Sequence, residues 1–173
     1  SWTLGSGNTF VEGIDSPYAL KLGGTSLPTM IKTFSQSQNF SISADVIVHR
    51  IGVGVFDGIL FMGSIASNTN RENLYIADGE IRSYRQGGTG TGVTLNSGVM
   101  VEIGKKYKVG YVRNGNSRKI FVDGVMVASD AHSNSVSASN NIYIGGSRYD
   151  SNPQYSTLTI DNLIITTGDP RFK

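Results

Sequence analysis

Apolar and polar residues alternate along much of this chain, and short turn segments interrupt the alternation. A period of two is typical of a β-strand with one buried and one solvated face. In the clearest run, residues 39–49, the apolar side chains on one face are Phe40, Ile42, Ala44, Val46 and Val48. Similar or weaker runs bring the expected total to about twelve strands, at 18–22, 29–34, 58–62, 73–77, 80–85, 107–113, 119–123, 125–128, 141–145 and 157–166.

Asx-Gly dipeptides separate several of these runs, at Asp78-Gly79, Asn114-Gly115 and Asp123-Gly124. Asx and Gly accept the positive φ of tight hairpin turns, so each dipeptide predicts a β-hairpin. Two longer connections are a Gly-rich segment at 87–92 and a polar one at 129–140, and no helix of two turns is expected. Many short strands joined by hairpins predict an all-β fold, a two-sheet antiparallel jelly-roll sandwich.

The period-two pattern also predicts which side chains form the core. We expect inward-facing side chains at Ile42, Val46, Val109, Phe121 and Ile144. No change in composition marks a second domain, so residues 1–173 are expected to form a single domain. The chain begins at Ser1 without an initiator Met, which suggests a piece of a larger protein.

Composition removes several functional classes. The chain has no Cys, which excludes disulfides, thiolate metal sites and Cys nucleophiles. The net charge of +2 comes without a basic run, so nucleic acid is not an expected partner. No apolar stretch approaches the roughly 20 residues that span a bilayer, so membrane insertion is not expected.

Several segments occur in an order that resembles a known family. They are Ala19–Gly24, Phe40–Val46, Lys105–Val112, Lys119–Val127, Ile142–Gly146 and Leu158–Thr166. This order is similar to laminin-G-like domains of the concanavalin A-like lectin and glucanase superfamily, and the resemblance implies a jelly-roll sandwich. The sequence departs from the family at Tyr107, where many members carry Trp, and it lacks the laminin-type disulfide.

The C-terminal segment Ile164–Phe172 is similar to the ending of laminin-G-like modules in phage tail and other virion proteins. This similarity implies a location on a virion or an extracellular surface. It also implies other virion or surface protein subunits as partners, within a multimeric parent protein.

The carboxylates do not form the arrangement that glycosidases of this fold use. A retaining glycosidase needs two carboxyl groups roughly 5 Å apart, commonly on alternate positions of one strand. Turns or odd spacing separate the acidic residues Glu72, Asp78, Glu80, Glu102 and Asp123, and Asp45 and Asp57 stand alone. We therefore expect turn and surface carboxylates and no catalytic residues, and glycoside hydrolysis is a distant alternative.

Metal sites have equally little support in the sequence. His49 and His132 are the only histidines and are far apart along the chain. Asp161 occupies the position of a strand-borne Asp in the resembling family, which implies either a calcium ligand or a buried Asp that caps loop amides. The second reading is favoured because a calcium ion needs several oxygen ligands, and no cofactor is expected.

The best candidate for ligand binding is the loop at 148–155. It combines aromatic rings, which pack under sugar C–H faces, with side chains that bond hydroxyl groups, namely Arg148, Tyr149, Asp150, Asn152 and Tyr155. Tyr84 and Arg85, ahead of the Gly-rich segment, form a second cluster. The alternative is an ordinary polar loop whose tyrosines pack at the rim of the sandwich.

Together these features predict a non-catalytic module that binds a carbohydrate or a host receptor. The expected partner is a cell-surface glycan or receptor. The alternative is a structural or decoration module of a virion that makes protein contacts only.

Overall fold

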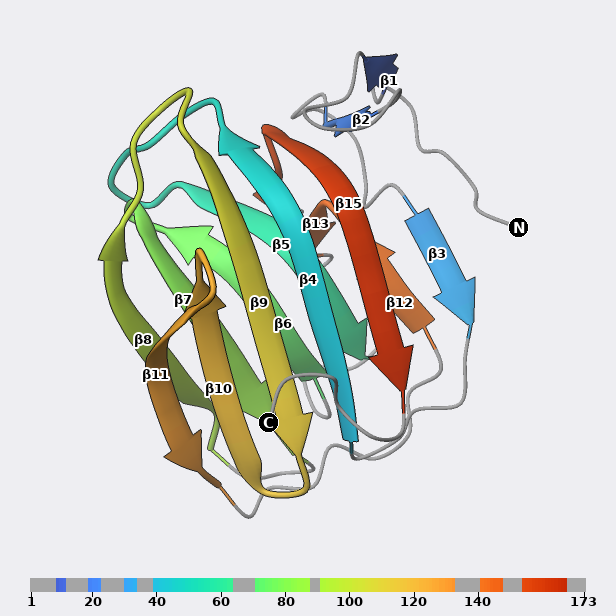
Figure 1. Cartoon of the computed structure of the whole chain (residues 1–173), viewed down its shortest axis with the longest axis vertical. Helices are drawn as coiled ribbons and strands as arrows, with labels where there is room; N and C mark the ends of the chain where they lie inside the picture. The colour runs from blue at the N-terminus through green and yellow to red at the C-terminus, as the bar shows by residue number, and fades with distance from the viewer. Residues whose placement is uncertain are drawn as a thin grey trace.

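The computed structural model describes residues 9–11, 19–22, 30–33, 39–63, 71–87, 91–132, 141–147 and 154–167. Every regular element in these ranges is a β-strand, and two large antiparallel sheets face each other (Figure 1). The predicted all-β sandwich is therefore confirmed. The same ranges contain no helix long and apolar enough to cross a membrane.

The first sheet has seven strands in the order β1-β2-β15-β4-β9-β10-β11. Their bounds are β1 Thr9–Val11, β2 Ala19–Lys21, β15 Leu158–Thr167, β4 Asn39–Val48, β9 Lys106–Asn114, β10 Ser117–Val122 and β11 Val125–Ala131.

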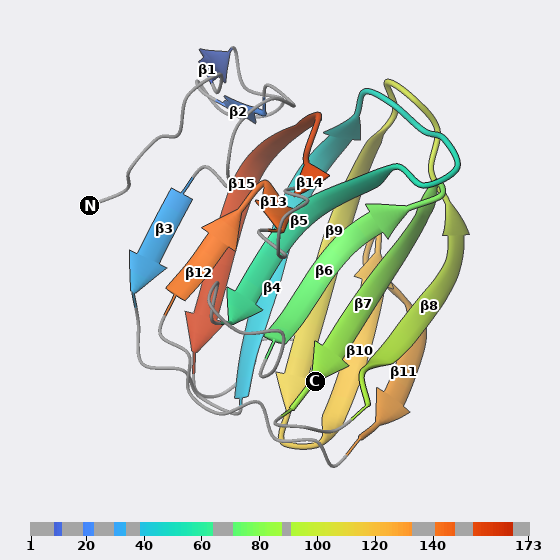
Figure 2. The same cartoon turned by 180° about the vertical axis from the view of Figure 1, so that it is seen from behind.

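The second sheet has six strands in the order β3-β12-β5-β6-β7-β8. Their bounds are β3 Met30–Thr33, β12 Asn141–Ile144, β5 Phe56–Gly63, β6 Arg71–Ala77, β7 Glu80–Gln86 and β8 Val93–Met100. The short strands β13 (Gly146–Ser147) and β14 (Gln154–Tyr155) pair with each other and contact β5 (Figure 2).

The alternation in β4 builds the centre of the seven-stranded sheet. All five predicted apolar positions are buried, with Phe40, Val46 and Val48 at 0% exposure. They meet inward-facing residues of β9, because Ile42 pairs with Tyr111 and Ala44 with Val109. Ile142 and Ile144 of β12 close the core from the other sheet. The inward positions predicted for Ile42, Val46, Val109 and Ile144 are confirmed.

Phe121 is a correction to the predicted core. Its neighbours Ile120 and Val122 are buried at 0% and 7% exposure, whereas Phe121 lies half-buried on the opposite face, against Gly110. Three apolar residues in a row make the face of this strand ambiguous, because either set of alternate positions could point inward. The β10–β9 register decides the face, since Ile120 pairs with buried Tyr111.

Two of the three predicted hairpin turns have the expected residues at their centre. Asp78-Gly79 and Asp123-Gly124 have positive φ at both positions, as a type I′ turn requires. At the third hairpin Asn114 ends β9, and the turn is formed by Gly115 and Asn116. Only Gly115 of these two has positive φ, which is the pattern of a type II′ turn.

Strand β8 was not predicted. Its sequence, Val93–Met100, contains Asn96, Ser97 and Gly98, which resemble a turn. Pairing with β7 overrides this local preference, and Ser83 pairs with the buried Leu95. Strand β8 also contacts β11 of the other sheet, so these two edge strands close one side of the sandwich (Figure 1).

Candidate ligand-binding site

The predicted loop site lies mainly outside the described residues. This applies to Arg148, Tyr149, Asp150 and Asn152. The backbone of Tyr155 is described, in β14, where it pairs with Gly146 of β13. These short strands contact β5, so the ends of the loop lie next to this strand of the six-stranded sheet.

Tyr84 and Arg85 do not share a surface. Along β7 the side chains alternate, with Ile81, Ser83 and Arg85 buried between the sheets and Arg82, Tyr84 and Gln86 on the outer face. Arg85 has 0% exposure. Of the two predicted residues of this cluster, only Tyr84 therefore reaches the outer face of the six-stranded sheet.

The ring of Tyr84 is held by neighbours on three sides. The guanidinium carbon of Arg71 lies 4.6 Å from the ring centroid, and Nη2 of Arg71 donates to the Tyr84 hydroxyl at 3.2 Å. The hydroxyl in turn donates to Oε1 of Gln86 at 3.0 Å. A Cβ atom at Gly92 would overlap the Tyr84 hydroxyl, so glycine at this position lets the ring lie across the start of β8.

Further polar and aromatic side chains extend this outer face along β6 and β7. Phe56 stacks on Tyr75 with ring centroids 4.4 Å apart. Nε of Arg82, which pairs with Tyr75 in the sheet register, donates to Oε2 of Glu80 at 2.9 Å. We call the side chains of Arg71, Tyr75, Arg82, Tyr84 and Gln86 the outer-face patch.

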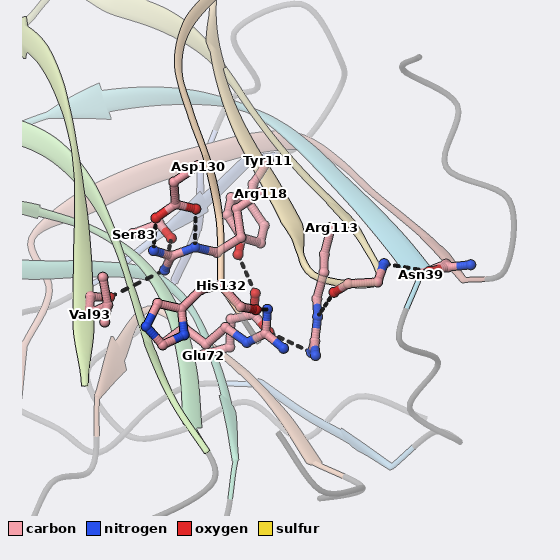
Figure 3. Close-up of polar contacts among 11 residues, drawn as sticks. Asn39, Glu72, Ser83, Val93, Tyr111, Arg113, Arg118, Asp130 and His132 are labelled. Atoms are coloured by element: carbon pink, nitrogen blue, oxygen red, sulfur yellow. Dashed lines mark hydrogen bonds and ion pairs between the residues drawn. The ribbon is translucent and has the colours of Figure 1, made fainter. Parts of the chain in front are cut away.

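Between the sheets the structure contains a second group of polar side chains, which the sequence did not predict (Figure 3). Nη1 of Arg113 donates to Oε2 of Glu72 at 2.8 Å, and the Tyr111 hydroxyl donates to Oε1 of the same carboxylate. Nε of Arg118 donates to Oδ1 of Asp130 at 2.8 Å. With Ser83 and Arg85 these residues form what we call the interior cluster.

The interior cluster lies at the end of the sandwich where β9 turns into β10. Arg113 and Arg118 lie opposite each other in the β9–β10 register, and both side chains have 0% exposure. Arg118 also donates to the carbonyl oxygen of Val93 at 3.3 Å, which joins β10 to β8 of the opposite sheet. The cluster therefore connects the two sheets with hydrogen bonds where an apolar core would otherwise continue.

Tyr111 provides a test of this interior environment. Burial, followed by the neighbouring Glu72 carboxylate, raises the pKa of Tyr111 well above its usual value of 10.0. An unfolded tyrosine loses its proton near pH 10 while folded Tyr111 keeps it, so the unfolded state binds fewer protons above that pH. Stability should then fall with rising pH, at about 1.4 kcal/mol per pH unit for this group.

We expect tyrosinate absorbance to show at least one of the eight tyrosines titrating only as the fold is lost. Tyr75, whose pKa burial also raises, should titrate late as well. The variant Tyr111→Phe should remove one late-titrating group. Titration of all tyrosines near pH 10, with far-UV circular dichroism unchanged, would contradict the burial of Tyr111.

Some of the acidic residues occupy the expected turn and surface positions, and others do not. Asp78 and Asp123 occupy turns as predicted. Glu72 and Asp57 are instead buried, at 1% and 0% exposure. Oδ1 of Asp57 accepts a hydrogen bond from the backbone N–H of Thr157 at 2.6 Å, so this carboxylate fixes the entry to β15. The prediction failed for Glu72 and Asp57 because both point inward from a strand. Their hydrogen-bond partners, Arg113 and Thr157, are far away in the sequence.

Asp161 lies directly opposite Asp45 in the β15–β4 register, and a bulge at Asn162 follows it. The Asn162 backbone N–H donates to Oδ1 of Asp161 at 2.7 Å, and Nδ2 of Asn162 donates to Oδ2 of Asp45 at 2.7 Å. Asp161 thus accepts a hydrogen bond from the backbone N–H of the next residue, within the bulge of β15. Within the described ranges no group of three or more His, Cys, Asp or Glu residues could hold a metal ion.

Comparison with known proteins supports the fold. Residues 22–167 match the laminin G family model described as the concanavalin A-like lectin/glucanases superfamily. A comparison with curated proteins gave no significant match.

Solved structures resemble this chain at low sequence identity. A carbohydrate-binding module, CBM66 from Bacillus subtilis, is 18% identical with a TM-score of 0.62, over 96% of this chain and 95% of that one. Domain 4 of AbnA, an extracellular arabinanase from Geobacillus stearothermophilus, solved with arabinotriose, is 18% identical with a TM-score of 0.72, over 93% and 75%.

The binding domain of botulinum neurotoxin serotype D is also 18% identical, with a TM-score of 0.71. The match covers 98% of this chain but only 44% of that structure. At these identities the similarity concerns the fold.

Proposed function

Because this chain belongs to the concanavalin A-like lectin/glucanases superfamily, we propose that it is a non-catalytic module that binds a cell-surface carbohydrate or receptor. The observation that carries the proposal is the outer-face patch. Tyr84 stands on a rigid strand with its ring already positioned by Arg71, Gln86 and Gly92. A binding site that is fixed before the ligand arrives loses less entropy on binding.

The chemistry of the patch suits a sugar. An aromatic ring offers an apolar face to sugar C–H groups, and the side chains beside it supply hydrogen bonds to hydroxyl groups. Arg71 and Arg82 donate, and Gln86 both donates and accepts. The carbohydrate-binding module CBM66 and domain 4 of AbnA, which was solved with arabinotriose, have the same fold, which supports this ligand class without identifying the glycan.

The loop residues Arg148, Tyr149, Asp150, Asn152 and Tyr155 remain part of the proposed site. Strands β13 and β14 contact β5, and Tyr84 lies on β7, with β6 between β5 and β7. A ligand of several sugar units could therefore extend from the loop across β6 to Tyr84. A shallow site of this kind predicts weak monovalent affinity, about millimolar.

Weak sites become useful when several are linked, because avidity can gain about 10²–10⁴. This favours a multimeric parent protein exposed on an extracellular surface. The resemblance of the C-terminal segment to virion modules supports a phage or other virion protein, with neighbouring subunits of the particle as further partners.

Hydrolysis is not part of the proposal. Asp45 and Asp161 lie opposite each other on the adjacent strands β4 and β15. Both are almost fully buried, and both accept hydrogen bonds from Asn162. A retaining mechanism needs one carboxyl free to donate a proton and another free to attack. An assay for release of reducing sugar from bound glycans should therefore be negative.

The test is a glycan array and a cell-binding assay with the domain displayed on a multimeric scaffold. Binding should be lost in Tyr84→Ala and weakened in Gly92→Ala, because the added Cβ displaces the Tyr84 ring. Loss in Tyr149→Ala with Tyr155→Ala should show that the loop contributes. The matched control Phe121→Ala removes an aromatic ring from the outer face of the other sheet and should leave binding unchanged.

The outcomes separate the alternatives. Binding that survives Tyr84→Ala but not the loop double variant would restrict the site to the loop. Absence of any bound glycan or cell surface with the intact multimer would instead favour the decoration module that makes protein contacts only.

A further inference from the structure

The interior cluster contains more positive than negative charge. Among its described side chains, three guanidinium groups, those of Arg85, Arg113 and Arg118, accompany two carboxylates, those of Glu72 and Asp130. Arginine stays protonated in proteins, so one positive charge is in excess when both carboxylates are ionised. An uncompensated charge in the interior is strongly unfavourable.

The excess charge resides on Arg85. Nη1 of Arg85 donates to the carbonyl oxygen of His132 at 3.2 Å, but its Nε and Nη2 are buried and have no hydrogen-bond partner. By contrast, Arg113 is paired with Glu72 and Arg118 with Asp130. Burial, followed by the charge of Arg113, lowers the pKa of Arg85.

The two unpartnered nitrogen atoms form one edge of the guanidinium plane. Nε–H and one N–H of Nη2 point in the same direction, and this is the edge with which arginine binds an anion through two parallel hydrogen bonds. Unpaired charge and unpaired donors thus occur at the same place. A water molecule could accept these hydrogen bonds but would leave the charge uncompensated.

We propose that the free edge of Arg85 binds a small monovalent anion, between chloride and formate in size. One negative charge matches the excess in the cluster. Because Arg85 has 0% exposure, its neighbours must move apart to admit any ion, and a smaller ion needs a smaller displacement. The bound anion would stabilise the junction between β7 of one sheet and the end of β11 of the other, which Arg85 already joins through the His132 carbonyl.

The direct test is anomalous diffraction from crystals of the intact chain grown in bromide. A bromide peak within hydrogen-bonding distance of Nε and Nη2 of Arg85 is expected. The second test measures the melting temperature against chloride concentration, with ionic strength held constant by a bulky sulfonate. The melting temperature should rise by about 5–10 °C between no chloride and about 100 times its dissociation constant.

Two arginine variants make the second test specific. Arg85→Met should abolish the chloride dependence, because it removes both the excess charge and the donors. Arg82→Met is the matched control, since it makes the same charge change three residues away on the outer face of β7, and it should retain the dependence. General salt effects on folding act on both variants alike.

The proposal is overturned if no bromide peak occurs beside Arg85, which would leave water as the occupant. It is also overturned if chloride stabilises Arg85→Met as much as the wild-type chain. Stabilisation by glucuronate but not by chloride or formate would contradict it as well, because the edge would then bind a sugar carboxylate.

Discussion

Glu72→Gln is expected to lower the free energy of unfolding by about 3–5 kcal/mol, the usual effect of removing one member of a buried ion pair. The substitution keeps the volume of the side chain but removes the negative charge that Arg113 and Tyr111 contact. Three buried arginines would then share the single carboxylate of Asp130. Urea denaturation should show a lower midpoint with an unchanged m-value.

The matched control is Glu102→Gln. Glu102 also forms an ion pair, with Lys105 at 2.6 Å, but its side chain is 70% exposed. Exposed ion pairs contribute about 0–1 kcal/mol, so this variant should melt almost as the wild-type chain does. The double variant Glu72→Gln with Arg113→Met should be less destabilised than the sum of its single variants, because the two groups interact directly. Equal effects of Glu72→Gln and Glu102→Gln would contradict the burial of the interior cluster.

The interior cluster also shows where sequence reasoning was insufficient. Local sequence patterns predicted the strands β4 and β7, because such a pattern depends only on residues within the strand. Whether an Arg or Glu on such a strand lies inside depends on partners 39 and 41 residues away, as with Tyr111 and Arg113 around Glu72. Charged residues are rarely buried unless paired, and pairing over such a separation leaves no local signal in a single sequence.

The candidate binding site was only partly predictable for a related reason. The composition around 84–86 indicated a cluster, but adjacent strand residues point to opposite faces, so Tyr84 and Arg85 could not belong to one surface. The contribution of Arg71 and Gly92 to the position of Tyr84 comes from neighbouring strands. A hairpin prediction from 71 through 86 with the correct register would have brought Arg71, Tyr84 and Gln86 together, since Arg71 pairs with Gln86.

The last prediction concerns which face of β10 is buried. Truncating the smaller side chain, Ile120, should lower the stability more than truncating the larger one, Phe121. Ile120 is fully buried in the core, so Ile120→Ala should cost about 2–5 kcal/mol through lost burial and the cavity left behind. Phe121 lies half-buried on the outer face, so Phe121→Ala should cost about 1 kcal/mol, although it removes more atoms. Urea denaturation of both variants measures the difference directly. A larger loss for Phe121→Ala than for Ile120→Ala would mean that β10 presents its other face to the core, since a shift of one residue exchanges the two faces of a strand.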